Sequence, residues 1–98
     1  MVVVLAGGVG GSKFLKGLAT TGEKIKAVIN TGDDIERFGL HISPDIDINL
    51  YTLAGVIHDQ GWGFKNDTYT CQNVLSDIYD QACWFNLGDK DLATHIYR

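Results

Sequence analysis

Two groups of residues in this sequence are suited to phosphate chemistry: a glycine-rich stretch with a lysine, and two pairs of aspartates. The glycine-rich stretch holds Gly7, Gly8, Gly10 and Gly11, and Lys13 follows it. Glycines let the backbone turn sharply and approach a ligand closely, because no Cβ is in the way. Where such a turn leads into a helix, free backbone N–H groups and the helix dipole attract anions. The stretch therefore predicts contact with a phosphate group, to which Lys13 adds a positive charge.

The glycine spacing differs from both common phosphate-binding motifs. No serine or threonine follows Lys13, as a P-loop requires. Lys13 also occupies the position of the third glycine in a dinucleotide fingerprint that Gly8 and Gly10 begin. A tight strand-to-helix turn without a ligand is the alternative interpretation.

The aspartates lie in two short segments, Asn30-Thr31-Gly32-Asp33-Asp34 and Ser43-Pro44-Asp45-Ile46-Asp47. Clustered carboxylates without a Cys/His cluster favour Mg²⁺, which prefers oxygen ligands. Positions i and i+2 of a helix point about 200° apart, so either Asp45 lies in the entry turn before the helix becomes regular, or Asp45 and Asp47 face different neighbours and have different roles. We favour different roles. The alternatives are structural: turn formation at 30–34, and a favourable helix dipole interaction for Asp45 and Asp47.

The elements that position these residues begin with a βαβ unit. Apolar runs predict parallel strands at 2–6 and 25–30, joined by a helix at 12–20. Continuous apolar strands indicate an α/β fold whose sheet is covered on both faces. Asn30 follows the second strand, at the edge of the sheet where open α/β folds bind ligands.

The remainder of the chain predicts helices at 45–58, 69–81 and 90–98, the first with Ser43 as N-cap and Pro44 at its first position. Trp62 and Phe64, in the loop between, either fill core or stack on a planar ligand. Two strands seldom make an independent sheet, so residues 1–98 are expected to be the N-terminal part of one larger α/β domain.

Composition limits the classes of function. The 98 residues carry a formal charge of −4, which argues against a nucleic-acid partner, and no apolar run is long enough to span a membrane. Cys71 and Cys83 make no disulfide framework and are expected to be reduced thiols in a cytoplasmic protein. The three histidines, His41, His58 and His95, show no metal-ligand spacing, so none is expected to bind a metal.

Four stretches together resemble one family: 5–18 (LAGGVGGSKFLKGL), 28–34 (VINTGDD), 42–55 (ISPDIDINLYTLAG) and 84–98 (WFNLGDKDLATHIYR). The chain resembles the N-terminal third of the 2-phospho-L-lactate transferases, CofD and its actinobacterial counterpart FbiA. The resemblance implies a Rossmann-like three-layer fold with a parallel sheet. It also implies a Mg²⁺-dependent enzyme of coenzyme F-420 biosynthesis. Such an enzyme moves a phospholactyl or phosphoenolpyruvyl group from a guanosine diphosphate-linked donor, such as lactyl-2-diphospho-5′-guanosine, to the deazaflavin Fo and releases GMP.

The resemblance also implies roles for particular residues. Asp47 would be the catalytic residue that meets the ribityl hydroxyl of Fo, with Lys90 near the same acceptor, and Asp34 and Asp45 would hold Mg²⁺. The expected donor-binding residues are Gly7, Gly8, Gly10, Gly11, Lys13 and Asn30. Family analogy also suggests a homodimer.

Two other interpretations compete with this one. The gluconeogenesis-factor family has a similar glycine-rich start and an Asp-Asp loop, and its members are nucleotide-sugar-binding regulators. Ile35-Glu36-Arg37-Phe38 follows the aspartates here in place of that family's glycines and serines, which favours the transferases. An NAD-binding Rossmann domain would need an acidic residue at the end of the second strand, where Asn30 stands.

Overall fold

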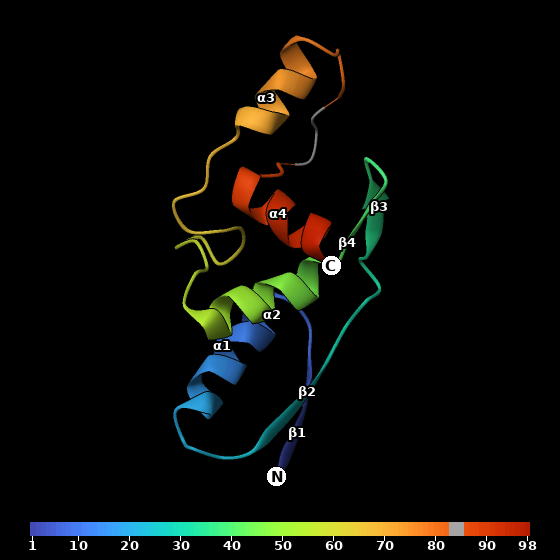
Figure 1. Ribbon diagram of the computed structural model, residues 1–98. Helices are drawn as coiled ribbons and strands as arrows, with labels where there is room; N and C mark the ends of the chain where they lie inside the picture. The colour runs from blue at the N-terminus through green and yellow to red at the C-terminus, as the bar shows by residue number, and fades with distance from the viewer. Residues whose placement is uncertain (83–85) are drawn as a thin grey trace.

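The computed structural model describes residues 1–82 and 86–98. Strands β1 (Val2–Ala6) and β2 (Ile25–Ile29) pair in parallel, and helix α1 (Val9–Ala19) connects them (Figure 1). The register runs from Val2 opposite Ile25 to Ala6 opposite Ile29. The predicted βαβ unit is therefore confirmed, with strand bounds within one residue of those expected.

A small apolar core lies between α1 and one face of the β1–β2 sheet. Val4 and Ala6 of β1 and Leu15 of α1 are its buried members. The opposite face exposes Val3, Leu5 and Val28. Alternate residues of β1 therefore point into the core and away from it. Among the described residues, the sheet is covered on one of its two faces, not on both as expected.

Helix α1 begins at Val9, three residues earlier than predicted, so Gly10 and Gly11 are helical and only Gly7 and Gly8 form the turn. A Cβ on Gly11 would lie 2.8 Å from the Cβ of Ala6. The glycine thus lets α1 pack closely on β1. The expected helix start at residue 12 is corrected accordingly.

A short antiparallel hairpin that sequence analysis did not predict follows β2. It consists of β3 (Ile35–Arg37) and β4 (Leu40–Ile42), joined at Phe38 and Gly39, both of which have positive φ angles. Three-residue strands give little periodicity, and Phe-Gly is not one of the usual hairpin turn sequences. The hairpin carries the chain from β2 to the start of the next helix.

Helix α2 (Pro44–Ala54) begins as predicted, with Ser43 at the N-cap and proline in the first turn. It ends four residues earlier than expected, because Gly55 adopts a left-handed conformation with φ 75°. The backbone N–H groups of Gly55 and Val56 then close the helix on the carbonyls of Thr52 and Tyr51. Helix α1 packs against α2 (Figure 1).

Helices α3 (Thr70–Asp77) and α4 (Asp89–Tyr97) cap each other through two aspartates. Asp89 accepts hydrogen bonds from the backbone N–H groups of Thr70 (3.0 Å) and Cys71 (3.0 Å) at the start of α3. Asp67, which precedes α3, accepts them from Lys90 (2.8 Å) and Asp91 (3.3 Å) at the start of α4. The two helix starts are therefore fixed together. Cys83, expected to be a reduced thiol, lies outside the described residues, and Cys71 is a free thiol.

The architecture is α/β, with a parallel two-strand sheet and four helices in the described residues, as in part of a Rossmann-like fold. The molecule is elongated, 50 × 26 × 21 Å, with the β1–α1–β2 unit at one end and α3 at the other (Figure 1). Among the described helices, none is both long enough and apolar enough to cross a membrane.

Candidate active site

The first turn of α2 carries Asp45 and Asp47, whose side chains point to different neighbours. The amide of Asn30, just after β2, donates a hydrogen bond to Asp45 (3.1 Å). Asp47 instead accepts two hydrogen bonds from the guanidinium of Arg98, at 2.7 and 3.0 Å. The expected divergence of the two carboxylates is thus seen, and it gives the site two sides that share one helix turn.

The glycine turn, Asn30 and Asp45 form the first side of the site. A Cβ on Gly8 would lie 3.1 Å from Asp45 Oδ1, so glycine allows the turn to approach the carboxylate. Asn49 donates hydrogen bonds from its amide to the carbonyls of Gly7 and Asp45, both at 2.8 Å. The carboxyl ends of β1 and β2 and the first turns of α1 and α2 therefore meet here.

The other glycine-stretch residues have different surroundings. A Cβ on Gly10 would meet no described atom within 4 Å, whereas Gly11 packs on Ala6. Lys13 lines a separate groove between α1 and residues 57–65. The structure thus brings Gly7, Gly8, Asn30 and Asp45 together but not Lys13.

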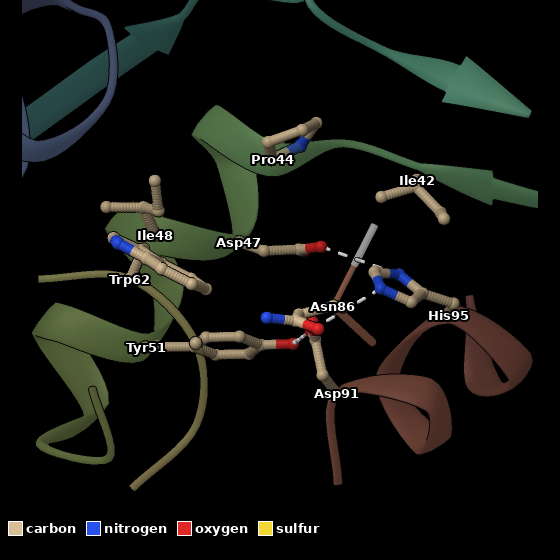
Figure 2. A pocket seen from close by; sticks show the side chains of 10 residues that line it. Ile42, Pro44, Asp47, Ile48, Tyr51, Trp62, Asn86, Asp91 and His95 are labelled. Atoms are coloured by element: carbon tan, nitrogen blue, oxygen red, sulfur yellow. Dashed lines mark hydrogen bonds and ion pairs between the residues drawn. The ribbon is translucent and has the colours of Figure 1, made fainter. Parts of the chain in front are cut away.

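The second side of the site is a cavity of about 390 Å³ beside α2. Its lining residues come from β4, α2, the 61–63 loop, the segment before α4 and α4 itself, and are Ile42, Pro44, Asp47, Ile48, Tyr51, Trp62, Gly63, Asn86, Asp91 and His95 (Figure 2). Figure 2 shows Trp62 and Ile48 on the side opposite His95. The cavity therefore has one apolar, aromatic wall and one polar wall, as ligand-binding cavities commonly do.

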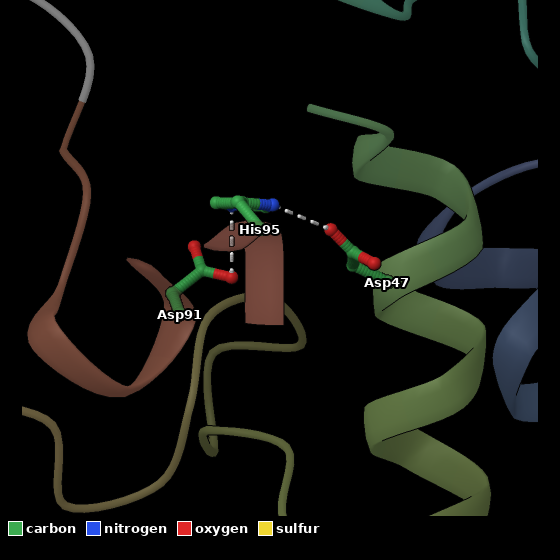
Figure 3. Close-up of side chains that lie close together, drawn as sticks. All are labelled: Asp47, Asp91 and His95. Carbon is green, nitrogen blue, oxygen red and sulfur yellow. Dashed lines mark ion pairs between the residues drawn. The ribbon is translucent and has the colours of Figure 1, made fainter. Parts of the chain in front are cut away.

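The polar wall is a network centred on His95, which is 4% exposed. His95 Nδ1 lies 3.5 Å from Asp47 and its Nε2 lies 3.4 Å from Asp91 (Figure 3). The hydroxyl of Tyr51 donates a 2.6 Å hydrogen bond to the same oxygen of Asp91, and Arg98 lies 3.2 Å from His95 Nδ1. Two carboxylates and one guanidinium thus surround the imidazole.

The network changes the acidity of its members. Burial raises the pKa of Tyr51, and the hydrogen bond to Asp91 raises it further, so the phenol stays protonated. The hydrogen bonds to Asp47 raise the pKa of Arg98 although burial opposes this, so the guanidinium stays charged.

Asp34 lies outside this network, between the hairpin and α2. It accepts 2.9 Å hydrogen bonds from His41 and from Ser43, whose hydroxyl therefore does not cap α2. Burial alone would raise the pKa of Asp34, but these hydrogen bonds and the charges of His41 and Arg98 lower it. Its Oδ1 is buried and has no hydrogen-bond partner among the residues that the structure describes.

The residues expected to hold Mg²⁺ fit that ion by donor type. The unpartnered Asp34 Oδ1 leaves one carboxylate oxygen for a cation, and Asp45 offers a second carboxylate. Asp47, Asp91 and His95 also offer ligand atoms within 4.8 Å of one another. That set includes an imidazole, which Mg²⁺ does not favour, and Arg98 already neutralises Asp47. We therefore interpret this trio as a polar network.

Lys90, expected near the acceptor, does not line the cavity but lies near Phe64, which contacts the cavity residue Tyr51. Its ammonium is 6.0 Å from the ring centroid of Phe64, which packs edge-on against Tyr51 at 4.8 Å. Trp62 lines the cavity, whereas Phe64 does not line it and instead packs against the ring of Tyr51.

Sequence analysis missed Tyr51, Asp91, His95 and Arg98 as site residues. Asp91 and His95 are four apart and so share one face of α4, which is the signal that could have found them. Their proximity to Asp47 depends on how α4 packs beside α2 and β4, which residue spacing does not reveal.

The fold and these clusters place the chain in the class of Rossmann-like α/β proteins. The family model of "2-phospho-L-lactate transferase CofD" matches residues 2–98, and the chain belongs to this family. It is 47% identical to a phosphoenolpyruvate transferase of Thermobifida fusca, over 99% of this chain and 34% of that protein. It is 48% identical to one of Streptomyces griseus and 41% identical to one of Mycolicibacterium smegmatis, again over 99% of this chain. The chain spans about a third of the length of these curated relatives.

Proposed function

We propose that the intact protein carrying this chain is a transferase of coenzyme F-420 biosynthesis. It moves a phosphoenolpyruvyl or phospholactyl group from a guanosine diphosphate-linked donor to a hydroxyl of the deazaflavin Fo, and it releases GMP. Family membership and the names of the relatives support the transferase class. The observation that carries the proposal is the first turn of α2, where Asp45 faces the glycine turn and Asp47 faces the cavity.

We assign the donor's phosphates to the glycine-turn side. Backbone N–H groups at the start of α1 and the positive end of its dipole favour an anion there, and Asn30 adds an amide. Gly7 and Gly10 would meet no described atom on gaining a Cβ, so the backbone has room for a close ligand. Lys13 reaches this anion only if its exposed side chain turns away from its groove.

We assign Fo to the cavity, with its flat ring system toward Trp62 and its ribityl hydroxyl toward Asp47. Asp47 would orient or deprotonate this hydroxyl for in-line attack, and the two hydrogen bonds that it accepts from Arg98 hold its carboxylate in place. Lys90, beside Phe64, gives this side a positive charge. Phosphoryl-type transfer needs such positioning and charge neutralisation more than covalent participation by the protein.

Asp34 and Asp45 are the residues that would hold Mg²⁺. When bound, the ion would neutralise the charge that develops on the donor's phosphates. A homodimer remains our expectation from family analogy, and a cytoplasmic location from two cysteines that make no disulfide framework.

The test is the kinetics of two variants of the intact protein with donor, Fo and varied Mg²⁺, following GMP release. We expect Asp47→Asn to lower kcat by roughly two to four powers of ten while donor binding is retained. Asp45→Asn should instead raise the Mg²⁺ concentration needed for half-maximal rate. Asp77→Asn at the end of α3 is the matched control and should behave like wild type.

Near-wild-type rates for both site variants would refute these residue roles. Absence of GMP release from the wild-type protein would refute the proposed reaction itself. Donor binding without transfer would support a nucleotide-binding regulator instead.

A further inference from the structure

The side chain of Asn49 joins helix α2 to the glycine turn. It is 3% exposed, and its amide nitrogen lies 2.8 Å from the carbonyl oxygen of Gly7 and 2.8 Å from that of Asp45. The reverse orientation of the amide would place its oxygen against both carbonyl oxygens, so the N–H groups face them. Asn49 Oδ1 is then buried without a hydrogen-bond partner among the described residues. Because such an acceptor costs stability, we look for the purpose of Asn49 in the two carbonyls that it holds.

The hydrogen bond from Asn49 fixes the peptide unit between Gly7 and Gly8. This peptide is trans and planar, so its carbonyl and its N–H point in opposite directions. Since the carbonyl points to Asn49, the N–H of Gly8 points away from it, and no residue that the structure describes accepts a hydrogen bond from this N–H. A Cβ on Gly7 would meet no described atom within 4 Å. The N–H of Gly8 is therefore available to a ligand beside the turn.

The peptide between two glycines rotates easily unless something holds it. Its rotation changes only ψ of Gly7 and φ of Gly8, and neither residue has a Cβ that would oppose the change. The rotated peptide would present a carbonyl oxygen where the N–H had been, and that oxygen repels a phosphate. By holding the carbonyl of Gly7, Asn49 selects the orientation that suits an anion.

We propose that Asn49 is a positioning residue for the donor, which holds the Gly7–Gly8 peptide so that the N–H of Gly8 binds a phosphate oxygen. This inference rests on the proposed function. The same amide is bonded to the backbone carbonyl of Asp45, whose carboxylate we assign to Mg²⁺. One buried side chain thus fixes the phosphate-binding turn relative to the first turn of α2.

The experiment measures kcat and both KM values in the intact protein with donor, Fo and Mg²⁺, for wild type and Asn49→Leu. Leucine has nearly the shape of asparagine but donates no hydrogen bond. We expect the KM for the donor to rise about 10- to 100-fold, the scale of one hydrogen bond to a charged group, with little change in kcat or in the KM for Fo. The melting temperature should stay near that of wild type, because leucine also removes the unpartnered Oδ1.

Thr52→Val is the matched control, because Thr52 is also polar, lies on the same helix and is 6% exposed. It should match wild type in both KM values. A wild-type donor KM in folded Asn49→Leu would overturn the inference while leaving the proposed reaction intact. An equal rise of the two KM values would assign Asn49 to the packing of α2 and would also overturn it.

Amide NMR of the wild-type intact protein decides the case in which Asn49→Leu does not fold. When the donor saturates the protein, the Gly8 N–H resonance should move downfield, as expected for a hydrogen bond to a charged oxygen, while the side-chain NH₂ resonances of Asn49 change little. An unchanged Gly8 resonance at saturation would overturn the inference. A wild-type protein that binds no donor would overturn the proposed function first, and with it this inference.

Discussion

At the scale of single residues, neighbours in the sequence have unlike surroundings. Asp45 and Asp47 are separated by one residue, yet one contacts Asn30 and the other contacts Arg98. Gly10 and Gly11 are adjacent, yet a Cβ would meet open space at the first and Ala6 at the second. Helical geometry makes the aspartate divergence predictable from the sequence, but not the identity of the partners.

This contrast predicts different results for substitutions at the two glycines. A Cβ at position 10 meets no described atom within 4 Å, and valine has a slightly higher helix propensity than glycine. The free energy of unfolding of Gly10→Val should therefore stay within about 0.5 kcal/mol of that of wild type. If backbone approach binds the donor, its KM should still rise at least tenfold, which is about 1.4 kcal/mol. Gly11→Ala should destabilise the protein by about 1–3 kcal/mol, because its Cβ would lie 2.8 Å from that of Ala6.

Thermal melting and donor kinetics on the same preparations separate these effects. An unchanged donor KM in folded Gly10→Val would mean that the donor does not approach the backbone at the start of α1.

At the scale of elements, the sequence predicts the parts that obey strong local patterns. Strands β1 and β2 are continuous apolar runs, and Ser43-Pro44 marks the start of α2. The β3–β4 hairpin was not predicted, because strands of three residues are too short to show a clear alternation of apolar and polar residues. The polar wall of the cavity could not be predicted from the sequence, because Asp47 and His95 lie on different helices and only tertiary packing brings them to 3.5 Å. Gly55 was overlooked as a helix stop, although its left-handed conformation is a common C-terminal signal.

The mutual caps of α3 and α4 predict an acid-sensitive contribution to stability. Hydrogen bonds from Thr68 and from the backbone of Cys71 and Thr70 lower the pKa of Asp89, with burial opposing them. A carboxyl whose folded-state pKa is lowered contributes stability above its unfolded pKa, near 4, and loses it as pH falls through the folded value. Asp89→Asn should therefore lower the melting temperature at pH 7, and its difference from wild type should shrink toward pH 3.

Melting curves at both pH values test this, with Asp77→Asn as control at an α3 carboxylate that has no capping role. A difference between wild type and Asp89→Asn that stays constant with pH would contradict it.

At the scale of the whole molecule, the two faces of the β1–β2 sheet are unequal. The inner face packs on Leu15 of α1, which is 1% exposed, whereas Leu5 on the outer face is 81% exposed. Val3 and Val28 extend that outer face. Apolar surface arranged in this way tends to promote association in water.

We therefore expect the 98-residue chain to bind a hydrophobic dye and to associate as its concentration rises. Leu5→Lys should reduce both, since it places a charge at the centre of the face, while circular dichroism stays unchanged. Ile78→Lys is the control, because Ile78 is also exposed and follows α3, which lies at the opposite end of the molecule from the sheet (Figure 1). Equal effects of the two substitutions in dye binding and size-exclusion chromatography would contradict a specific role for this face.

The mutual caps also have a consequence for motion. The N–H groups of Thr70 and Cys71 at the start of α3 are protected by a residue of α4, and those of Lys90 and Asp91 at the start of α4 by a residue that precedes α3. Fraying of the first turn of α4 would release Asp89, the acceptor at the start of α3, and movement of the segment before α3 would release Asp67, the acceptor at the start of α4. We therefore expect the amide hydrogens at the two starts to exchange with solvent through one shared opening event, as a single cooperative unit of local unfolding, although 11 residues separate the helices along the chain.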